Sequence, residues 1–369
     1  MFAKAKPQPK AIFETMKVPR ALLKMALPTI ASQLITLIYN IADTWFIGQT
    51  DDPYKVAASS LALTVFIMTV VLANLFGVGG GTLMVRLMGS GQEDEAKKVA
   101  SLSLVMAGGA ALVFSLLSLI FMDPILYLLG ASANTIGYAR QYLLFVVVLG
   151  GVPTVLSQTM STMVRNTGHA QKAGFGLGMG GVLNVVLDPL FMFVIMPKGM
   201  EVTGAAIATM LSNMASLTYF IFTYRKLSRS TLLAIPRRIE KVSKPSIKSL
   251  FAVGVPAAAG VLLFDITNMV INRLASGHGD IPLAAMGLVL KMERLPLNIG
   301  IGICLGMVPL VAYNFASGDK KRMRAFFRAS QVAVVSVALV SVVLYRLFAP
   351  YIVGAFIGEA QMCCWAPGF

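Results

Sequence analysis

Residues 21–48, ALLKMALPTIASQLITLIYNIADTWFIG, form an apolar run long enough for a helix to cross a membrane. About 20 apolar residues suffice to cross ~30 Å of hydrocarbon. In lipid every backbone polar group must be hydrogen-bonded without water, and the run is far longer than a barrel strand, so it predicts a membrane-spanning α-helix. Its only charged residues are Lys24, near its start, and Asp43, in its second half.

The composition of the whole chain also indicates a protein that is surrounded by lipid. Of the 369 residues 57% are hydrophobic and 13% are charged, and the mean hydropathy is +0.77. Too few polar side chains remain to cover a water-facing surface. Apolar windows of spanning length recur at residues 22–48, 57–85, 99–122, 141–164, 173–196, 202–224, 250–275, 282–312 and 329–349. The sequence therefore predicts an all-α polytopic membrane protein with nine spans.

Lys and Arg residues are distributed unevenly between the two ends of these windows. If the N-terminus lies in the cytoplasm, 24 of the 31 Lys and Arg residues fall in cytoplasmic segments and four fall outside. This bias predicts the orientation by the positive-inside rule, and we expect a multi-pass protein of the inner (plasma) membrane. The net charge of +15 then marks the cytoplasmic face and does not indicate a nucleic-acid partner.

The chain repeats itself at a shift of 227 or 228 residues. ALPTIASQLITLIYNIAD (26–43) aligns with GVPAAAGVLLFDITNMVI (254–271), which places Pro28 over Pro256. Both copies start on the cytoplasmic side, so the repeat is parallel and predicts two helical lobes related by an axis along the membrane normal. Six of the predicted spans fall in the first copy and three fall in the second.

The repeat predicts how the chain is divided. The expected parts are a cytoplasmic N-terminal segment (1–20), an N-lobe (21–226), a cytoplasmic basic linker (227–248), an incomplete C-lobe (249–358) and an atypical tail (359–369). We expect the C-lobe to lack three helices, because the repeat stops after Pro350, which matches Pro124 in the first copy. The terminal QMCCWAPGF (361–369) has no counterpart there, which favours a truncated or frameshifted gene.

Several motifs in combination resemble a known family. They are LPTIASQLITLIYNIADTWFIGQ (27–49), NVVLDP (184–189), GAAIAT (204–209) and the turns Ser90-Gly91 and Ser317-Gly318. From about residue 17 to 358 the chain resembles the MATE (multidrug and toxic compound extrusion) family, particularly its DinF-like branch. The resemblance implies two lobes that face a central cavity, and export of organic cations in exchange for H⁺ or Na⁺.

Two carboxylates lie within apolar spans of the first lobe. A charge at the centre of a helix in lipid costs about 2.5–3.5 kcal/mol on insertion scales, so acids retained there predict a function. Tyr39 precedes Asp43 by four residues, and Asn184 precedes Asp188 by four, so each pair projects from one helix face and can interact. The alternative is that both acids cap or pin helices, as Asp188 would by preceding Pro189.

The family resemblance assigns roles to these residues. It implies that Asp43 and Asp188 bind the coupling ion, either a proton or Na⁺. Asn184 and Tyr39 would lie beside them, with Thr209 of GAAIAT as a further member. Na⁺ is the only metal ion implied, and we expect no other cofactor.

The second lobe carries its own group of ionisable residues, which are Asp265, Lys291, Glu293 and Arg294. Asp265 resembles the acidic position that another branch of the family uses for cation binding in the second lobe, and helix packing is its alternative role. Glu293 either neutralises its two basic neighbours, or all three line the substrate cavity. One helix cannot hide three ionisable groups from both lipid and water.

Proline and glycine residues inside the spans indicate bending and close packing. Pro28 and Pro256 each remove one backbone hydrogen bond, and we expect both to act as hinges. Gly176, Gly178 and Gly181 match G-x-G-x-x-G, but no strand precedes them. Close helix contact or bending therefore explains these glycines better than a dinucleotide site does.

The sequence as a whole predicts a secondary multidrug efflux antiporter rather than an enzyme. We expect small organic cations and the lipid bilayer as partners, no nucleic acid, and a monomer. Two alternatives stay open: a transport-inactive truncated product or structural membrane protein, and a lipid or oligosaccharide-lipid flippase of the same superfamily. A membrane enzyme is disfavoured because the sequence shows no metal-ligand cluster and no Ser/His/Asp set, and both histidines, His169 and His278, fall in predicted loops.

Overall fold

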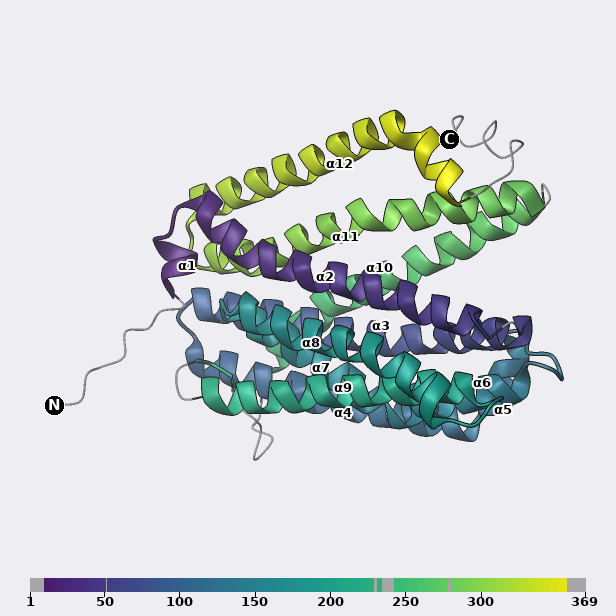
Figure 1. The fold of residues 1–369 in the computed structure, drawn as a ribbon. Coiled ribbons are helices and arrows are strands. Elements are labelled where there is room, and N and C mark those ends of the chain that lie inside the picture. Colours follow the sequence, from purple (N-terminus) through teal and green to yellow (C-terminus); the bar gives the residue numbers. More distant parts are fainter. Residues whose placement is uncertain (1–9, 51, 229–230, 234–241, 278–279, 357–369) are drawn as a thin grey trace.

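The described part of the chain is built from helices (Figure 1). The computed structural model describes residues 10–50, 52–228, 231–233, 242–277 and 280–356, and within these ranges no strand occurs. The predicted all-α fold is therefore confirmed. The elements are α1 (Lys10–Glu14), α2 (Val18–Gly48), α3 (Pro53–Gly89), α4 (Glu93–Ile120), α5 (Met122–Leu128), α6 (Ile136–Leu143), the π-helical η1 (Leu144–Leu149), α7 (Gly151–Asn166), α8 (Ala170–Pro189), the π-helical η2 (Leu190–Ile195), α9 (Glu201–Leu227), α10 (Lys244–Ser276), α11 (Asp280–Ala316) and α12 (Lys320–Phe356).

Eight helical segments of the described chain are long and apolar enough to cross a membrane, and a bent pair makes up to nine. The bent pair joins Ile136–Leu149 to Gly151–Asn166 at 47°. Each of the nine predicted windows falls on one of these spans. The bend follows from the π-helical turn of η1, where the Gly150 amide donates to the Phe145 carbonyl oxygen at 2.9 Å, five residues back. The division into six and three spans stays a prediction.

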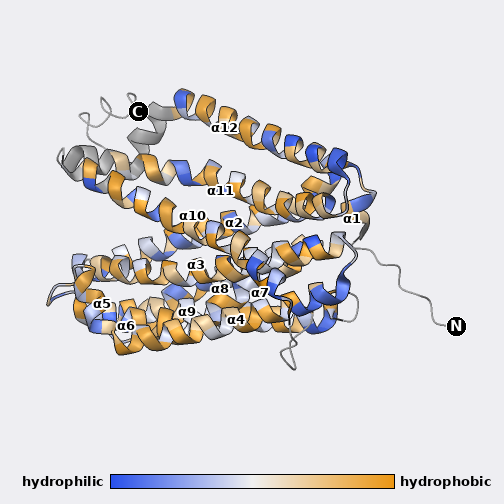
Figure 2. Ribbon diagram, turned by 180° about the vertical axis from the view of Figure 1, so that it is seen from behind, coloured by the Kyte–Doolittle hydropathy of each residue, from blue (hydrophilic) through white to orange (hydrophobic). Residues whose placement is uncertain are grey.

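The first half of the described chain (residues 10–228) meets the second half (residues 242–356) mainly through α2 and α3 on one side and α10 and α11 on the other. Helix α2 packs on α8 within the first half and on α11 from the second, while α3 packs on α4 and α7 and also on α10. Helices α10 to α12 lie close to the first half at the end of the bundle that carries α1, and they diverge from it toward the opposite end (Figures 1 and 2). The halves are therefore joined at one end and splayed at the other.

Glycine allows the backbones to approach at the joined end. A Cβ at Gly254 of α10 would lie 2.2 Å from the carbonyl oxygen of Leu75 on α3. A Cβ at Gly306 of α11 would lie 2.8 Å from the Cα of Ala26 on α2. Without a hydrophobic force between helices in lipid, contact at this range supplies the van der Waals packing that holds them together.

Helix α1 closes the same end. The Phe13 ring stacks on Tyr313 of α11 with ring centroids 4.9 Å apart. The Phe13 carbonyl oxygen accepts hydrogen bonds from Arg322 Nε at 2.6 Å and from Asn314 Nδ2 at 3.2 Å. The Phe13 ring also lies beside Gly168 of the first half, so α1 bridges both halves.

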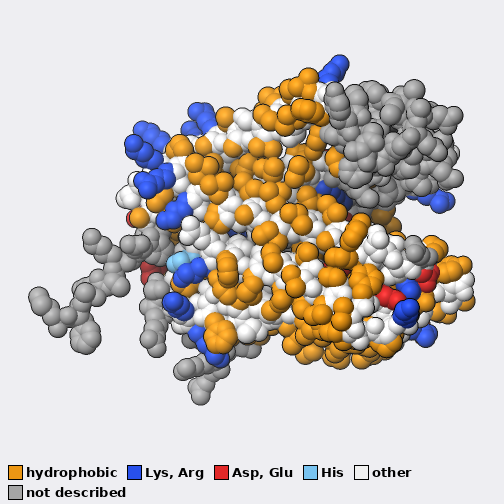
Figure 3. All heavy atoms as spheres, in the orientation of Figure 1, with side chains coloured by type: hydrophobic (Ala, Val, Ile, Leu, Met, Phe, Trp, Pro, Cys, Tyr) orange, Lys and Arg blue, Asp and Glu red, His pale blue; other side chains and the backbone are white. Residues whose placement is uncertain are grey.

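Charged side chains are segregated along the bundle. Lys and Arg side chains gather at the end near α1, and an apolar surface covers the middle of the molecule (Figure 3). Many large apolar side chains of the spans are exposed, among them Leu339 on α12 at 62%. Such a broad apolar surface fits contact with lipid rather than with water.

The close approach of α3 and α10 predicts that alanine substitutions at two glycines of α10 change the free energy of unfolding in opposite directions. Gly254→Ala should lower the free energy of unfolding in detergent by about 1–3 kcal/mol, because its methyl group overlaps the Leu75 carbonyl oxygen. Gly260→Ala, on the same helix with open space around it, should raise that free energy by up to about 1 kcal/mol through helix propensity. Thermal unfolding of both purified variants measures this, and equal effects would contradict the packing described for Gly254.

Candidate functional site

The first polar cluster within the spans begins with Asp43 on α2. Its side chain is buried, with 8% of the residue exposed. Its Oδ1 atom accepts no hydrogen bond from the described residues. The carboxylate lies within interaction range of the Tyr142 hydroxyl on α6. A carboxylate thus lies inside the first half with incomplete hydrogen bonding.

Helix α8 contributes the second carboxylate. Asp188 is fully buried, and Asn184 Nδ2 donates to Asp188 Oδ1 at 3.0 Å. The same amide donates to Thr209 Oγ1 on α9 at 3.2 Å. The i, i+4 spacing brings Asn184 and Asp188 together as predicted, and Thr209 joins them as predicted.

These groups form one cluster, here called the first-half cluster: Asp43, Tyr142, Asn184, Asp188 and Thr209. The two carboxylates interact through charge with each other and with the Tyr142 hydroxyl. Three of its oxygen atoms, Asp43 Oδ1, Asn184 Oδ1 and Asp188 Oδ2, are buried and accept no hydrogen bond from described residues. Buried acceptors without donors suit either an added proton or a hard cation such as Na⁺, which prefers oxygen ligands. The residues therefore fit both ions that the sequence analysis considers.

The hydroxyl beside Asp43 differs from the expected one. No hydrogen bond joins Tyr39 to Asp43 among the described side chains, although the two groups interact through charge. The i, i+4 spacing places the two side chains on one face of α2 but does not require a hydrogen bond between them. The ring packs near Gly181 of α8 instead. Tyr142 is therefore the hydroxyl in interaction range of the Asp43 carboxylate, while Tyr39 interacts through charge with Asp43 and Asp188.

No sequence pattern predicted that Tyr142 belongs to this cluster. It lies on the short helix α6, just before the π-helical η1, in a window that otherwise reads as apolar. Its side chain is 1% exposed. Only the bend after η1 and the packing of α6 on α9 explain why it points into the first half.

The second-half residues form a different arrangement from the expected one. Arg294 of α11 lies over the Phe264 ring of α10 at 4.9 Å and interacts through charge with Asp265. Glu293 is exposed and forms no ion pair with Arg294 among the described side chains. The carboxylate with which Arg294 interacts is therefore Asp265 on the adjacent helix. Lys291 lies in α11, but its side chain is outside the described residues.

The prolines and glycines lie where close packing and bending were expected. Pro28 lies inside α2 and Pro256 inside α10, and both helices continue through them. Their role as hinges stays a prediction. A Cβ at Gly176 would meet the Phe220 ring at 2.5 Å, and one at Gly181 would meet Ile35 at 2.8 Å, which confirms close helix contact for these glycines.

Spans in two halves that join at one end and splay at the other, with ionisable groups buried inside, define the class of multi-pass membrane transporters. The family model described as MatE matches residues 28–190 and 256–369. The two matches begin 228 residues apart, which is the shift of the internal repeat. The chain belongs to the MATE family of multidrug efflux transporters.

Individual relatives agree with this family. The multidrug export protein MepA of Staphylococcus aureus (strain MRSA252) is 31% identical over 344 residues, which are 93% of this chain and 75% of that protein. MepA of Staphylococcus saprophyticus is 30% identical over 350 residues, 95% of this chain and 76% of that protein. The finer placement in the DinF-like branch stays a prediction.

Solved structures share the fold. An outward-facing multidrug resistance MATE family transporter of the MOP superfamily superposes with a TM-score of 0.89 at 21% identity, over 99% of this chain and 80% of that one. A MOP superfamily transporter from Pyrococcus furiosus superposes with a TM-score of 0.88 at 22% identity over the same shares.

The hydrogen bonds of Asn184 yield a prediction on stability. Asn184→Ala removes the donor to Asp188 and Thr209, and it should lower the free energy of unfolding in detergent by about 1–3 kcal/mol because a buried carboxylate loses its partner. The control is Asn74→Ala, since Asn74 Nδ2 donates only to the Val70 carbonyl oxygen of its own helix. Thermal or denaturant unfolding compares the two. A loss no larger than that of the control would contradict the bonding described here.

Proposed function

We propose that this protein is a secondary antiporter that exports lipophilic organic cations in exchange for H⁺ or Na⁺. The observation that carries the proposal is the first-half cluster, in which three buried oxygen atoms of Asp43, Asn184 and Asp188 accept no hydrogen bond from the described residues. Membership of the MATE family and the multidrug export activity in the name of its MepA relatives support the direction of transport.

In this proposal the cluster binds the ion more tightly in one conformation of the protein than in the other, and this difference couples ion binding to the conformational change. A ligand shifts a conformational equilibrium only as far as it binds one state better than the other. In the splayed state the carboxylates of Asp43 and Asp188 hold the proton or Na⁺, which removes their mutual repulsion. A change in the position of α2 against α8 separates the two acids, weakens ion binding and releases the ion on the other side.

Pro28 supplies a place at which α2 can change. A proline inside a helix removes one backbone hydrogen bond and one packing constraint. Pro28 lies fifteen residues before Asp43 on the same helix, near the joined end of the bundle. Bending there would move Asp43 relative to Asp188 while the glycine contacts between α2 and α11 hold the base of the helix.

The second half supplies a place for the substrate. Arg294 offsets the charge of Asp265, whereas Glu293 is exposed and has no basic partner among the described side chains. The carboxylates of Asp265 and Glu293 favour cations, and the apolar spans favour lipophilic ones. Asp265, Glu293, Lys291 and Arg294 are therefore proposed to line the cavity for the exported compound.

The ion-coupling role of Asp43 is tested by transport. In proteoliposomes with an imposed H⁺ or Na⁺ gradient, the wild-type chain should drive movement of a fluorescent organic cation. Asp43→Asn keeps the size of the side chain but removes its titrating charge, and it should reduce the gradient-driven rate to that of protein-free vesicles. Asp123→Asn is the matched control, because Asp123 is an exposed carboxylate that pairs with Arg140.

Two results would overturn this proposal. Gradient-driven transport by Asp43→Asn at the wild-type rate, with the same pH and Na⁺ dependence, would remove Asp43 from the coupling step. A wild-type rate equal to that of protein-free vesicles under both gradients would exclude antiport altogether.

The orientation of the chain in the plasma membrane is a separate proposal, with the N-terminus in the cytoplasm. It is supported by the excess of Lys and Arg at the end of the bundle near α1. In a chain with its three native cysteines replaced by serine, Lys198→Cys should react with a membrane-impermeant maleimide added to intact cells. Gln92→Cys should react only after the cells are opened. The reverse pattern would invert the topology.

A further inference from the structure

A small basic pocket lies where α7 connects to α8, at the joined end of the bundle. Lys24 of α2 together with His169 and Lys172 contributes its charged or polar groups, and its volume is about 160 Å³. The first residues of α8 also line it, and no side chain caps the amide groups of that helix end. A negative group would meet two ammonium groups and open amide donors there.

The positive charge of this pocket has no balancing carboxylate among the residues that the structure describes. Neither Lys24 nor Lys172 forms an ion pair with a carboxylate in the described part of the chain. His169 lies in the connection outside the spans, and burial together with the charges of Lys172 and Lys24 lowers the pKa of its imidazole. Lys226 of α9 adds a further positive charge near Lys172.

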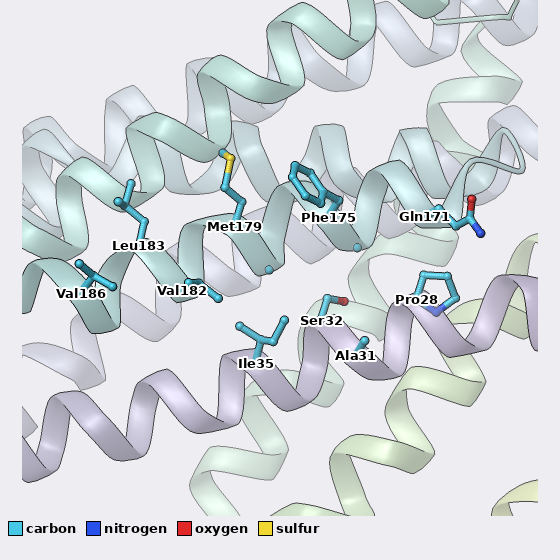
Figure 4. Close-up of a pocket in the computed structure, with 12 residues that line it drawn as sticks. Pro28, Ala31, Ser32, Ile35, Gln171, Phe175, Met179, Val182, Leu183 and Val186 are labelled. Atoms are coloured by element: carbon cyan, nitrogen blue, oxygen red, sulfur yellow. The ribbon is translucent and has the colours of Figure 1, made fainter.

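An apolar groove lies between α2 and α8, next to the basic pocket (Figure 4). Gln171 lines both, and the groove has a volume of about 630 Å³. Apolar side chains of both helices form its walls: Pro28, Ala31 and Ile35 from α2, and Phe175, Met179 and Val182 from α8. From Gln171 to Val186 the groove follows α8 for about 22 Å at 1.5 Å per residue.

Glycine explains why a groove remains between two packed helices. A Cβ at Gly174 would lie 2.4 Å from the Pro28 carbonyl oxygen, so the two backbones touch at the floor. Larger side chains stand to either side of this contact. Phe175 and Val186 are 62% and 58% exposed, which places the open side of the groove on the outer surface of the bundle, where lipid lies.

We propose that this pocket and groove bind one anionic phospholipid, with its phosphate in the basic pocket and an acyl chain along the groove. The groove is longer than the about 15 Å of hydrocarbon in one leaflet, so it can hold most of an acyl chain. Basic pockets between spans on the cytoplasmic side recognise such headgroups through charge. A free phosphate would leave the apolar groove unexplained. The site is separate from the first-half cluster, so the proposal stands apart from the antiport mechanism.

Native mass spectrometry of the full purified chain tests the site with defined lipids. Phosphatidylglycerol should bind more tightly than phosphatidylcholine with the same acyl chains. The double variant Lys24→Gln, Lys172→Gln should weaken phosphatidylglycerol binding about thirtyfold, because each lysine attracts an anionic lipid. The control is Lys244→Gln, Lys248→Gln, which removes the same charge from exposed positions on α10 and should bind like wild type.

A second pair of variants tests the groove without changing charge. Ala31→Trp places a large ring in the groove and should weaken phosphatidylglycerol binding, whereas Ile38→Trp, at an exposed position outside the groove on the same helix, should not. The thermal midpoint of each variant shows that the fold is retained.

Three results would overturn the proposal. One is equal phosphatidylglycerol affinity in wild type and the Lys24/Lys172 variant. Another is an equal loss in the Lys244/Lys248 control, which would show an unlocalised effect of charge. The third is competition by inorganic phosphate as strong as that by phosphatidylglycerol, together with unchanged binding in Ala31→Trp. This result would assign the pocket to a free anion. None of these measurements depends on whether the chain transports cations.

Discussion

The structure depends on one constraint, which is the cost of keeping carboxylates where there is no water. A charge inside lipid costs several kcal/mol unless protein groups or an ion compensate it. Asp188 receives one hydrogen bond from Asn184, which in turn is held by Thr209 on α9. Asp43 lies against Tyr142. The oxygen atoms Asp43 Oδ1, Asn184 Oδ1 and Asp188 Oδ2 accept no hydrogen bond from the described residues.

The rest of the fold fastens the two halves at the end of the bundle that lies away from this cluster. The two halves are fastened at the basic end, where glycine brings α3 to α10 and α2 to α11, and where Phe13 of α1 bonds to α11 and α12. Asp43 lies in the C-terminal part of α2, and Asp188 lies near the C-terminal end of α8. Both positions are toward the splayed end of the bundle. Both acids therefore lie away from the fastened end. Lipid bound between α2 and α8 would contact the same helices near Pro28.

Sequence patterns predicted the features that depend on periodicity and composition. Nine apolar windows predicted the spans, and the i, i+4 spacing predicted the pairing of Asn184 with Asp188. The patterns could not predict Tyr142, because its place in the cluster depends on the bend between α6 and α7. They also missed the charge interaction of Asp265 with Arg294, because these residues lie on two helices that only tertiary packing brings together. The groove between α2 and α8 depends on tertiary contact at Gly174 for the same reason.

Infrared difference spectroscopy can show whether the first-half cluster binds the coupling ion, as we propose. The full chain in lipid would be titrated with pH and with Na⁺ while the carboxyl stretching bands of isotopically labelled aspartate are recorded. If the cluster binds the ion, one carboxyl band should change with pH, with Na⁺ or with both. That band should be lost in Asp43→Asn or Asp188→Asn and kept in Asp123→Asn. Identical difference spectra for wild type and all three variants would contradict it.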